Sequence, residues 1–294
     1  MNAFVTAVVV SHDADELFAV TANRLAAQTR LPDHTLVIDT SVHTENAPIK
    51  ELSEALGFEY LKLPASTSLQ SAIDAATQGI TGQDQWLWLL HDDSAPDADA
   101  LAALLAAIEA SPSVALAGPK LVRWQQPRVI TQLGLTLTPG GAPFSPVDEQ
   151  FDQGQLDDLD DVLAIGTAAA MIRLDVLQEL SGFDANAPLL AADIDLAVRA
   201  RLAGHRVIVV PAARVEHAEL ALHGKRKRSW LGTSPKTAIR RATIHLILAY
   251  SPIVSALLYW LFLPVLGLLR AVMQVARKRP EMIWAEVASA VWGF

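Results

Sequence analysis

The sequence contains no cysteine, which excludes a disulfide framework and a cysteine-ligated zinc site. The absence of thiols is compatible with a reducing compartment. Residues 1–4 begin neither a basic segment nor a long apolar segment, so we expect no cleaved signal peptide. The stretch SHDADEL, which follows the first apolar run, has no glycine. That absence argues against the glycine-rich phosphate loop on which a nucleotidyltransferase usually depends.

Acidic residues are scarce near the end of the chain. From Leu220 onward there are 11 Lys and Arg but only 2 Asp and Glu, whereas the first 219 residues hold 12 basic and 30 acidic residues. The formal net charge is −9 and the mean hydropathy is +0.28, which is high for a purely soluble protein. An acidic body with a basic, apolar tail does not resemble a nucleic-acid-binding protein. It is typical of a soluble domain that ends in a membrane-facing segment.

The 294 residues are long enough for one large or two smaller domains with a full core. Short apolar runs alternate with segments of helical spacing in the first 117 residues. This alternation predicts an α/β domain with a mostly parallel sheet and flanking helices. The expected strands are 4–10, 36–38, 58–63, 86–90 and 114–117, and the expected helices are 13–28, 49–56, 68–78 and 97–110.

The pattern is less regular in the second part of the domain. Residues 128–137 are compatible with short strands. Residues 139–161 are rich in proline and glycine and then acidic, which indicates either a long, mobile, functional loop or a solvated acidic connection. A helix is expected over 193–203, with Gly204 as its C-cap. Strands are expected at 207–210 and at 213–215.

Acidic residues follow three of the predicted strands: Asp13, Asp39 and the pair Asp92 and Asp93. Ligands of parallel α/β sheets bind outside the carboxyl ends of the strands, so these carboxylates are expected to converge on one crevice. The alternative is that each aspartate only caps the helix that follows it.

The C-terminal part combines a basic stretch with a long apolar run. Residues 225–241 hold seven basic side chains, and residues 242–269 carry no formal charge but include Pro252 and Pro264. A bilayer span needs about 20 apolar residues, so the run is long enough to cross a membrane. Helices along the membrane surface, a re-entrant hairpin and a buried helix pair remain alternatives. The expected division is an α/β domain at 1–222, a basic linker at 223–241 and a membrane-associated helical segment at 242–294.

Six motifs follow one another along the chain: VVVSHD, LLHDDSAP, GTAAAMIR, GFD, ADIDLAVRARLAGHRV and VPAARVEH. Their order and spacing resemble the family 2 glycosyltransferases, which are inverting enzymes of the Rossmann-like GT-A fold, and particularly the actinobacterial, membrane-associated members. The resemblance covers about residues 4–219.

The resemblance implies a site for a nucleotide-sugar donor and for Mg²⁺ or Mn²⁺. Asp93 is the first candidate for a metal ligand and Asp92 the second, and His217 matches a histidine that completes the metal shell in many relatives. His91 stands where many members have Asp or Asn. The residues implied to line the donor site are Ser11, His12, Asp13, Asp39, Asp92, Gly166 and Thr167.

The general base implied by the resemblance is Asp193, although Ala192 stands where the family usually has Glu. By spacing alone Asp193 begins a helix, whose dipole would hold the carboxylate ionised. The expected activity is sugar transfer to a lipid-linked or polysaccharide acceptor of the cell envelope, at the cytoplasmic face of the cell membrane. The main alternative is a catalytically silent, sugar-nucleotide-binding scaffold domain, which the residues at 91 and 192 favour.

Overall fold

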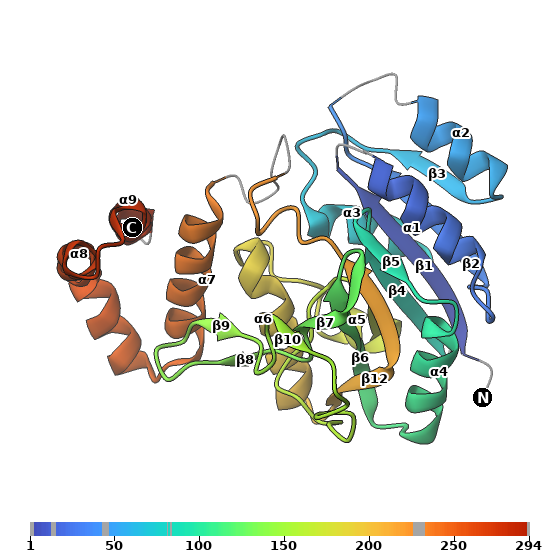
Figure 1. The fold of residues 1–294 in the computed structure, drawn as a ribbon. Coiled ribbons are helices and arrows are strands. Elements are labelled where there is room, and N and C mark those ends of the chain that lie inside the picture. Colours follow the sequence, from blue (N-terminus) through green and yellow to red (C-terminus); the bar gives the residue numbers. More distant parts are fainter. Residues whose placement is uncertain are drawn as a thin grey trace.

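The computed structural model describes residues 3–12, 16–42, 47–80, 82, 84–225 and 233–292. They form a curved mixed sheet with helices on both faces and a layer of C-terminal helices at one side (Figure 1). The strands of the large sheet are β1 (Phe4–Ser11), β2 (His34–Asp39), β3 (Glu59–Lys62), β4 (Gln85–His91), β5 (Ser94–Pro96), β6 (Val114–Arg123), β7 (Gln126–Gln132), β10 (Gln150–Phe151), β11 (Ala170–Arg173) and β12 (Arg206–His217), and β8 (Thr136–Leu137) pairs separately with β9 (Pro143–Phe144). The helices are α1 (Glu16–Ala26), α2 (Ala47–Ala55), α3 (Leu69–Thr77), α4 (Ala100–Ala110), α5 (Leu174–Glu179), α6 (Leu189–Leu202), α7 (Pro235–Tyr250), α8 (Ile253–Ala276), the 3₁₀ turn η1 (Pro280–Met282) and α9 (Ile283–Trp292).

The first half of the sheet has the order β3-β2-β1-β4, and its strands are parallel, as the sequence predicts. Both faces of β1 are buried, because alternate side chains enter two different cores. Val8 and Val10 pack in the core that contains α3, α5 and α6. Ala7 and Val9 pack in the core that contains α1, α2 and α4. Burial on both faces explains why the strand is an uninterrupted apolar run in the sequence.

The second half of the sheet is mixed. Strand β11 runs antiparallel between β4 and β6, and β12 runs parallel to β6. The two strands expected at 207–210 and 213–215 are one strand, β12, with a shift of register between Val210 and Arg214. A β-bulge of this kind adds residues to one strand without ending it, so it looks like a break in the sequence pattern.

The acidic segment 139–161 is not a structureless loop. It contributes β9 and β10, and its carboxylates are paired with basic residues of the sheet. Lys120, only 3% exposed, lies 3.1 Å from Asp152 Oδ2 and 2.5 Å from Asp157 Oδ1. Arg206 binds Asp160 and Asp161 in the same way. These carboxylates attach the segment to the sheet, and they also stay in contact with solvent, since Asp157, Asp160 and Asp161 are 54%, 62% and 44% exposed.

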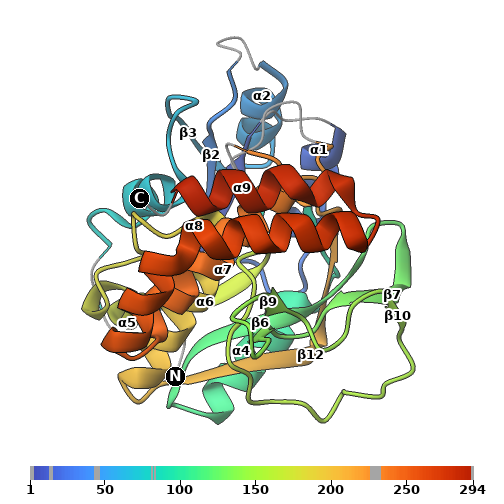
Figure 2. The same ribbon diagram turned by 90° about the vertical axis from the view of Figure 1, so that its left-hand side faces the viewer.

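The charge-free run 242–269 is divided between two helices. Helix α7 begins at Pro235, inside the expected basic linker, and buries Ala242 and Leu246 in the same core as α6. Helix α8 begins after Pro252, and it is the one described helix that is long and apolar enough to cross a membrane. Figure 2 shows α8 and α9 lying side by side across one face of the domain.

Candidate active site

The carboxyl ends of three neighbouring strands meet at one edge of the sheet. Ser11 at the end of β1 is in register with Asp39 at the end of β2, and Val10 is in register with His91 at the end of β4. The strand ends with acidic residues therefore lie at the same edge of the sheet, but Asp39 and Asp92 are not among the residues that line the cavities beside it. Asp13, which the sequence placed in the same group, lies outside the described residues.

A cavity of about 490 Å³ opens beside this edge. It is lined by residues from β4, β6, β7, β12, α6 and α7. Six of the residues singled out in the sequence line it: His91, Asp93, Gly166, Thr167, Asp193 and His217. Segments separated by more than a hundred positions in the sequence therefore surround one space.

Three of these side chains form a cluster with the composition of a metal site. Single ligand atoms of His91, Asp93 and His217 all lie within 4.8 Å of one another. His217 Nε2 is 3.5 Å from Asp93 Oδ1, and the rings of His91 and His217 are inclined at 65° to each other with centroids 5.7 Å apart. Thr167 Oγ1 lies 3.2 Å from His91 Nε2. Two imidazoles and one carboxylate suit Mn²⁺ better than Mg²⁺, which prefers oxygen ligands.

Asp92 is not part of this cluster. Its Oδ2 accepts hydrogen bonds from the backbone N–H of His12 (2.9 Å) and from Ser11 Oγ (3.3 Å). Residues 92 and 93 form the turn between β4 and β5, and their carboxylates face different partners. Asp92 binds the end of β1, whereas Asp93 lies beside His217. His91 belongs to the cluster with Asp93.

Asp39 is fully buried and holds the ends of β2 and β3 together. Its Oδ1 accepts from Ser41 N–H at 2.8 Å, and its Oδ2 accepts from Tyr60 Oη at 2.8 Å and from Lys62 Nζ at 3.0 Å. Burial by itself raises the pKa of a carboxyl, but the hydrogen bonds from Ser41, Lys62 and Tyr60 outweigh it and keep the pKa of Asp39 below its usual value. Tyr60 and Lys62 are the partners that the sequence analysis missed.

Asp193 lies in the second turn of α6, not at its start. The helix begins at Leu189 after Pro188, so Asp193 is neither the N-cap nor a residue of the first turn. The expectation that the helix dipole holds this carboxylate ionised is also wrong. Burial in the wall of the cavity raises the pKa of Asp193 to about 7, even though its Oδ1 accepts from Ile194 N–H at 2.9 Å. A carboxyl with this pKa can exchange a proton near neutral pH.

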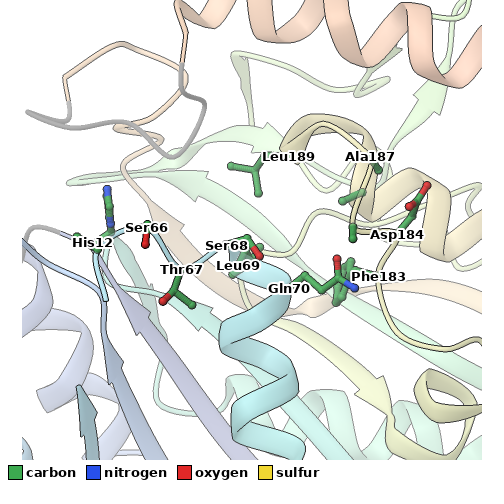
Figure 3. Close-up of a pocket in the computed structure, with 13 residues that line it drawn as sticks. His12, Ser66, Thr67, Ser68, Leu69, Gln70, Phe183, Asp184, Ala187 and Leu189 are labelled. Carbon is green, nitrogen blue, oxygen red and sulfur yellow. The ribbon is translucent and has the colours of Figure 1, made fainter. Parts of the chain in front are cut away.

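A second cavity, of about 330 Å³, lies on the other side of the first turns of α6. It is rich in hydroxyl groups, which come from the segment that leads into α3 (Figure 3). Its lining includes His12, Ser66, Thr67, Ser68, Gln70, Phe183, Asp184 and Ala192. Leu189 lines both cavities, so the beginning of α6 is the partition between them.

Comparison with known proteins settles the family. The sequence profile described as "Glycosyltransferase like family 2" matches residues 2–240. The chain belongs to glycosyltransferase family 2. The mixed sheet with flanking helices is the GT-A fold that the sequence predicts.

The individual relatives and solved structures that the chain resembles share only part of its length or a low sequence identity. The galactofuranosyltransferase GlfT1 of Mycobacterium tuberculosis, found in two strains, is 36% identical over 117 residues, a match that spans 37% of this chain and 37% of GlfT1. Two solved structures share the fold. GalNAc-T7 with UDP, GalNAc and Mn²⁺ has a TM-score of 0.58 at 16% identity, over 82% of this chain and 48% of that one. The mannosyltransferase PcManGT from Pyrobaculum calidifontis, with GDP-Man and Mn²⁺, has a TM-score of 0.54 at 16% identity, over 99% of this chain and 86% of that one.

Proposed function

We propose that this glycosyltransferase inverts the anomeric centre of a nucleotide-activated sugar and transfers that sugar to a hydroxyl of a lipid-linked or cell-envelope glycan acceptor. The observation that carries the proposal is the shared cavity, in which a His-Asp-His cluster and a carboxyl of raised pKa come from distant segments. The structural neighbours GalNAc-T7 and PcManGT, which hold UDP or GDP-Man together with Mn²⁺, support a nucleotide donor and a divalent cation.

We assign the metal to His91, Asp93 and His217. A bound Mn²⁺ or Mg²⁺ stabilises negative charge on the diphosphate leaving group of the donor. Thr167 beside His91 orients the imidazole. Gly166 leaves room for the side chain of Gln132, whose Oε1 accepts from Gly166 N–H at 3.2 Å and which also lines the cavity. Ser11, His12, Asp39 and Asp92 form the adjoining edge of the sheet, where we place the nucleotide.

We assign the role of general base to Asp193. A base has to lie on the face of the sugar opposite the leaving group when the anomeric centre is inverted. Asp193 comes from α6, whereas the metal cluster comes from β4, β12 and the turn after β4, so the cavity can hold a sugar between them. Its raised pKa suits proton removal from an acceptor hydroxyl near neutral pH.

The acceptor assignment rests on the apolar part of the same cavity. Leu222, Ile239 and Phe144 line the cavity and are each more than a third exposed. An acceptor with an apolar anchor would cover such side chains, and the basic tail after Leu220 favours the cytoplasmic face of the membrane.

A panel of nucleotide sugars tests the proposal directly. We expect at least one UDP- or GDP-linked sugar to raise the melting temperature in the presence of Mn²⁺, and to be hydrolysed or transferred by the protein. Stabilisation without Mn²⁺ dependence would contradict the metal assignment. Tight donor binding without any turnover over a range of acceptors would support the silent scaffold domain instead.

The proposed base predicts how the rate depends on pH. Only the ionised form of Asp193 accepts a proton, so activity should rise with pH and level off above about pH 7. One pH unit below the midpoint, kcat/KM should be about tenfold lower than on the plateau. The measurement is kcat/KM for sugar transfer at saturating metal from pH 5 to pH 9. A profile that is flat between about pH 5 and pH 8 would exclude a base with this pKa.

A further inference from the structure

We propose that α8 and α9 lie flat in one leaflet of an anionic lipid bilayer, as a two-helix hairpin that does not cross the membrane. The contact surface, called the apolar platform below, is the outward face of the two helices. Leu257, Leu261, Leu268, Val272, Trp284 and Val291 represent it. The proposal concerns membrane attachment alone and does not depend on the proposed donor, acceptor or base.

The apolar platform is far larger than scattered surface residues would produce. Along α8 the apolar side chains Ile253, Leu257, Leu261, Leu268 and Val272 are each more than half exposed. The adjacent α9 adds Trp284, which is 73% exposed, and Val291, which is 68% exposed. Soluble monomers rarely expose a continuous apolar surface of this extent, so it requires a covering partner.

The opposite face of the hairpin packs on α7 through apolar contacts, such as Leu263 and Ala290 with Ile244, and through a few buried polar side chains. Arg240 Nε of α7 lies 2.9 Å from Glu286 Oε2 of α9, and Gln274 of α8 donates to Glu286 Oε1 at 3.3 Å. Tyr259 Oη of α8 lies within hydrogen-bond distance of the guanidinium groups of Arg240 and Arg270. Buried charged pairs of this kind fix the side of the hairpin that faces the protein.

Helix α7 in turn fixes the hairpin against the catalytic domain. Ala242 and Leu246 of α7 belong to the domain core, and Tyr250 Oη donates to Asp195 Oδ1 of α6. The hairpin is therefore tangential to the domain, across the face seen in Figure 2. If α8 stood upright in a bilayer, α7 and the charged flank of the domain would have to enter the hydrocarbon.

The shape of α8 also disfavours a crossing. Pro264 lies in its interior, and Figure 2 shows the helix changing direction along its length. A proline bends a helix because it lacks the N–H and clashes with the preceding turn. The two halves have about 11 and 13 residues, or roughly 17 and 20 Å, and each is too short for a hydrocarbon core of about 30 Å. A bent amphipathic hairpin matches the interface instead.

The charge around the platform identifies a lipid surface rather than a second copy of the chain. Arg277 and Lys278 are exposed at the end of α8. The two acidic residues of this region, Glu281 and Glu286, are paired with Lys236 and Arg240. The rim of the platform is therefore cationic and complements anionic headgroups, whereas two copies face to face would bring like charges together. Exposed tryptophans on both helices suit the membrane interface.

The absence of native cysteine allows a direct test of topology with the full chain. Single cysteines replace Ala249, which is exposed just before α8, or Arg277, which is exposed just after it. Each variant is bound to preformed vesicles of phosphatidylglycerol and phosphatidylcholine and treated with a membrane-impermeant maleimide. We expect both positions to react completely from outside, with no increase after detergent. Protection of one position until detergent is added would show that α8 crosses the bilayer and would overturn the proposal.

Depth and composition give a second test. Spin labels on L257C, L268C and V291C should all report a similar, shallow depth in the bilayer.

The affinity for vesicles tests the charge and the apolar surface separately. Binding should be at least about tenfold stronger to vesicles with phosphatidylglycerol than to pure phosphatidylcholine, and weaker at high salt. The double variant L257E/L268E should bind at least about tenfold more weakly than the parent. The control L31E changes an exposed leucine distant from the hairpin and should bind like the parent. A stable soluble dimer that does not bind vesicles would overturn the proposal.

Discussion

Replacing Asp193 with asparagine should lower sugar transfer by about 10²–10⁴-fold while the affinity for the donor is retained. The amide has nearly the shape of the carboxyl but cannot accept the acceptor's proton. The loss should appear in kcat, because the base acts in the transition state rather than in binding. The measurements are steady-state transfer kinetics and donor binding by calorimetry. Residual activity in the variant should no longer show the rise towards about pH 7.

The stability of the same variant separates a catalytic role from a structural one. Because the pKa of Asp193 is raised from 3.8 to about 7 in the folded state, the folded protein holds this proton more tightly than the unfolded chain. Its free energy of unfolding therefore falls as pH rises through this window, by linkage. Asparagine removes that fall, so D193N should be at least as stable as the parent at about pH 8. A loss of activity that follows a lower melting temperature would contradict the assignment.

Replacing Asp93 with asparagine should weaken Mn²⁺ binding by about 100-fold or more and reduce turnover with it. Asp93 is the one carboxylate in the cluster with His91 and His217, so it supplies the negative charge that attracts the cation. The amide oxygen can still accept the N–H of Leu220, which Asp93 Oδ2 accepts at 3.0 Å. Free Mn²⁺ measured by electron paramagnetic resonance reports the affinity without any need for turnover. High Mn²⁺ concentrations should restore part of the activity.

The neighbouring variant D92N is the matched comparison. Asp92 holds Ser11 and the backbone of His12 and faces away from the cluster, so D92N should bind Mn²⁺ with an affinity close to that of the parent. Its expected defect is a lower melting temperature, since a carboxylate that accepts two hydrogen bonds is lost. If D92N lost Mn²⁺ and D93N kept it, the assignment of the two aspartates would be reversed.

The first half of the fold could be predicted from the sequence because its strands are buried on both faces. Such strands are uninterrupted apolar runs, as in residues 4–10 and 86–90, and helices of regular spacing separate them. The second half was harder, because its order depends on contacts between distant residues. Lys120 pairs with acids more than thirty positions away, and Pro211 in the bulge of β12 interrupts the sequence pattern as the end of a strand would. Both features arise only when the sheet is assembled.

In the candidate site too, some features could be predicted from the local sequence pattern and others depend on contacts between distant segments. The strand ends that carry Asp92 and Asp93 could be located by pattern, and Asp93, Asp193 and His217 line one cavity as the resemblance implies. The start of α6 was misplaced by four residues, because Leu189 and its neighbours carry no capping side chain. The pKa of Asp193 could not be predicted either, since burial depends on the walls that other segments provide.

The partition between the two cavities has a consequence for the residue beside the proposed base. Successive residues of a helix point about 100° apart, so Ala192 faces the hydroxyl-rich cavity while Asp193 faces the other. The small side chain of Ala192 takes up little of the second cavity, and Asp184 supplies the carboxylate of its lining. A glutamate at position 192 would add a larger side chain and a second negative charge. It would narrow the second cavity and repel an anionic ligand. The residue at position 192 thus influences the volume and charge of the second cavity, whereas the proposed base at position 193 faces the first.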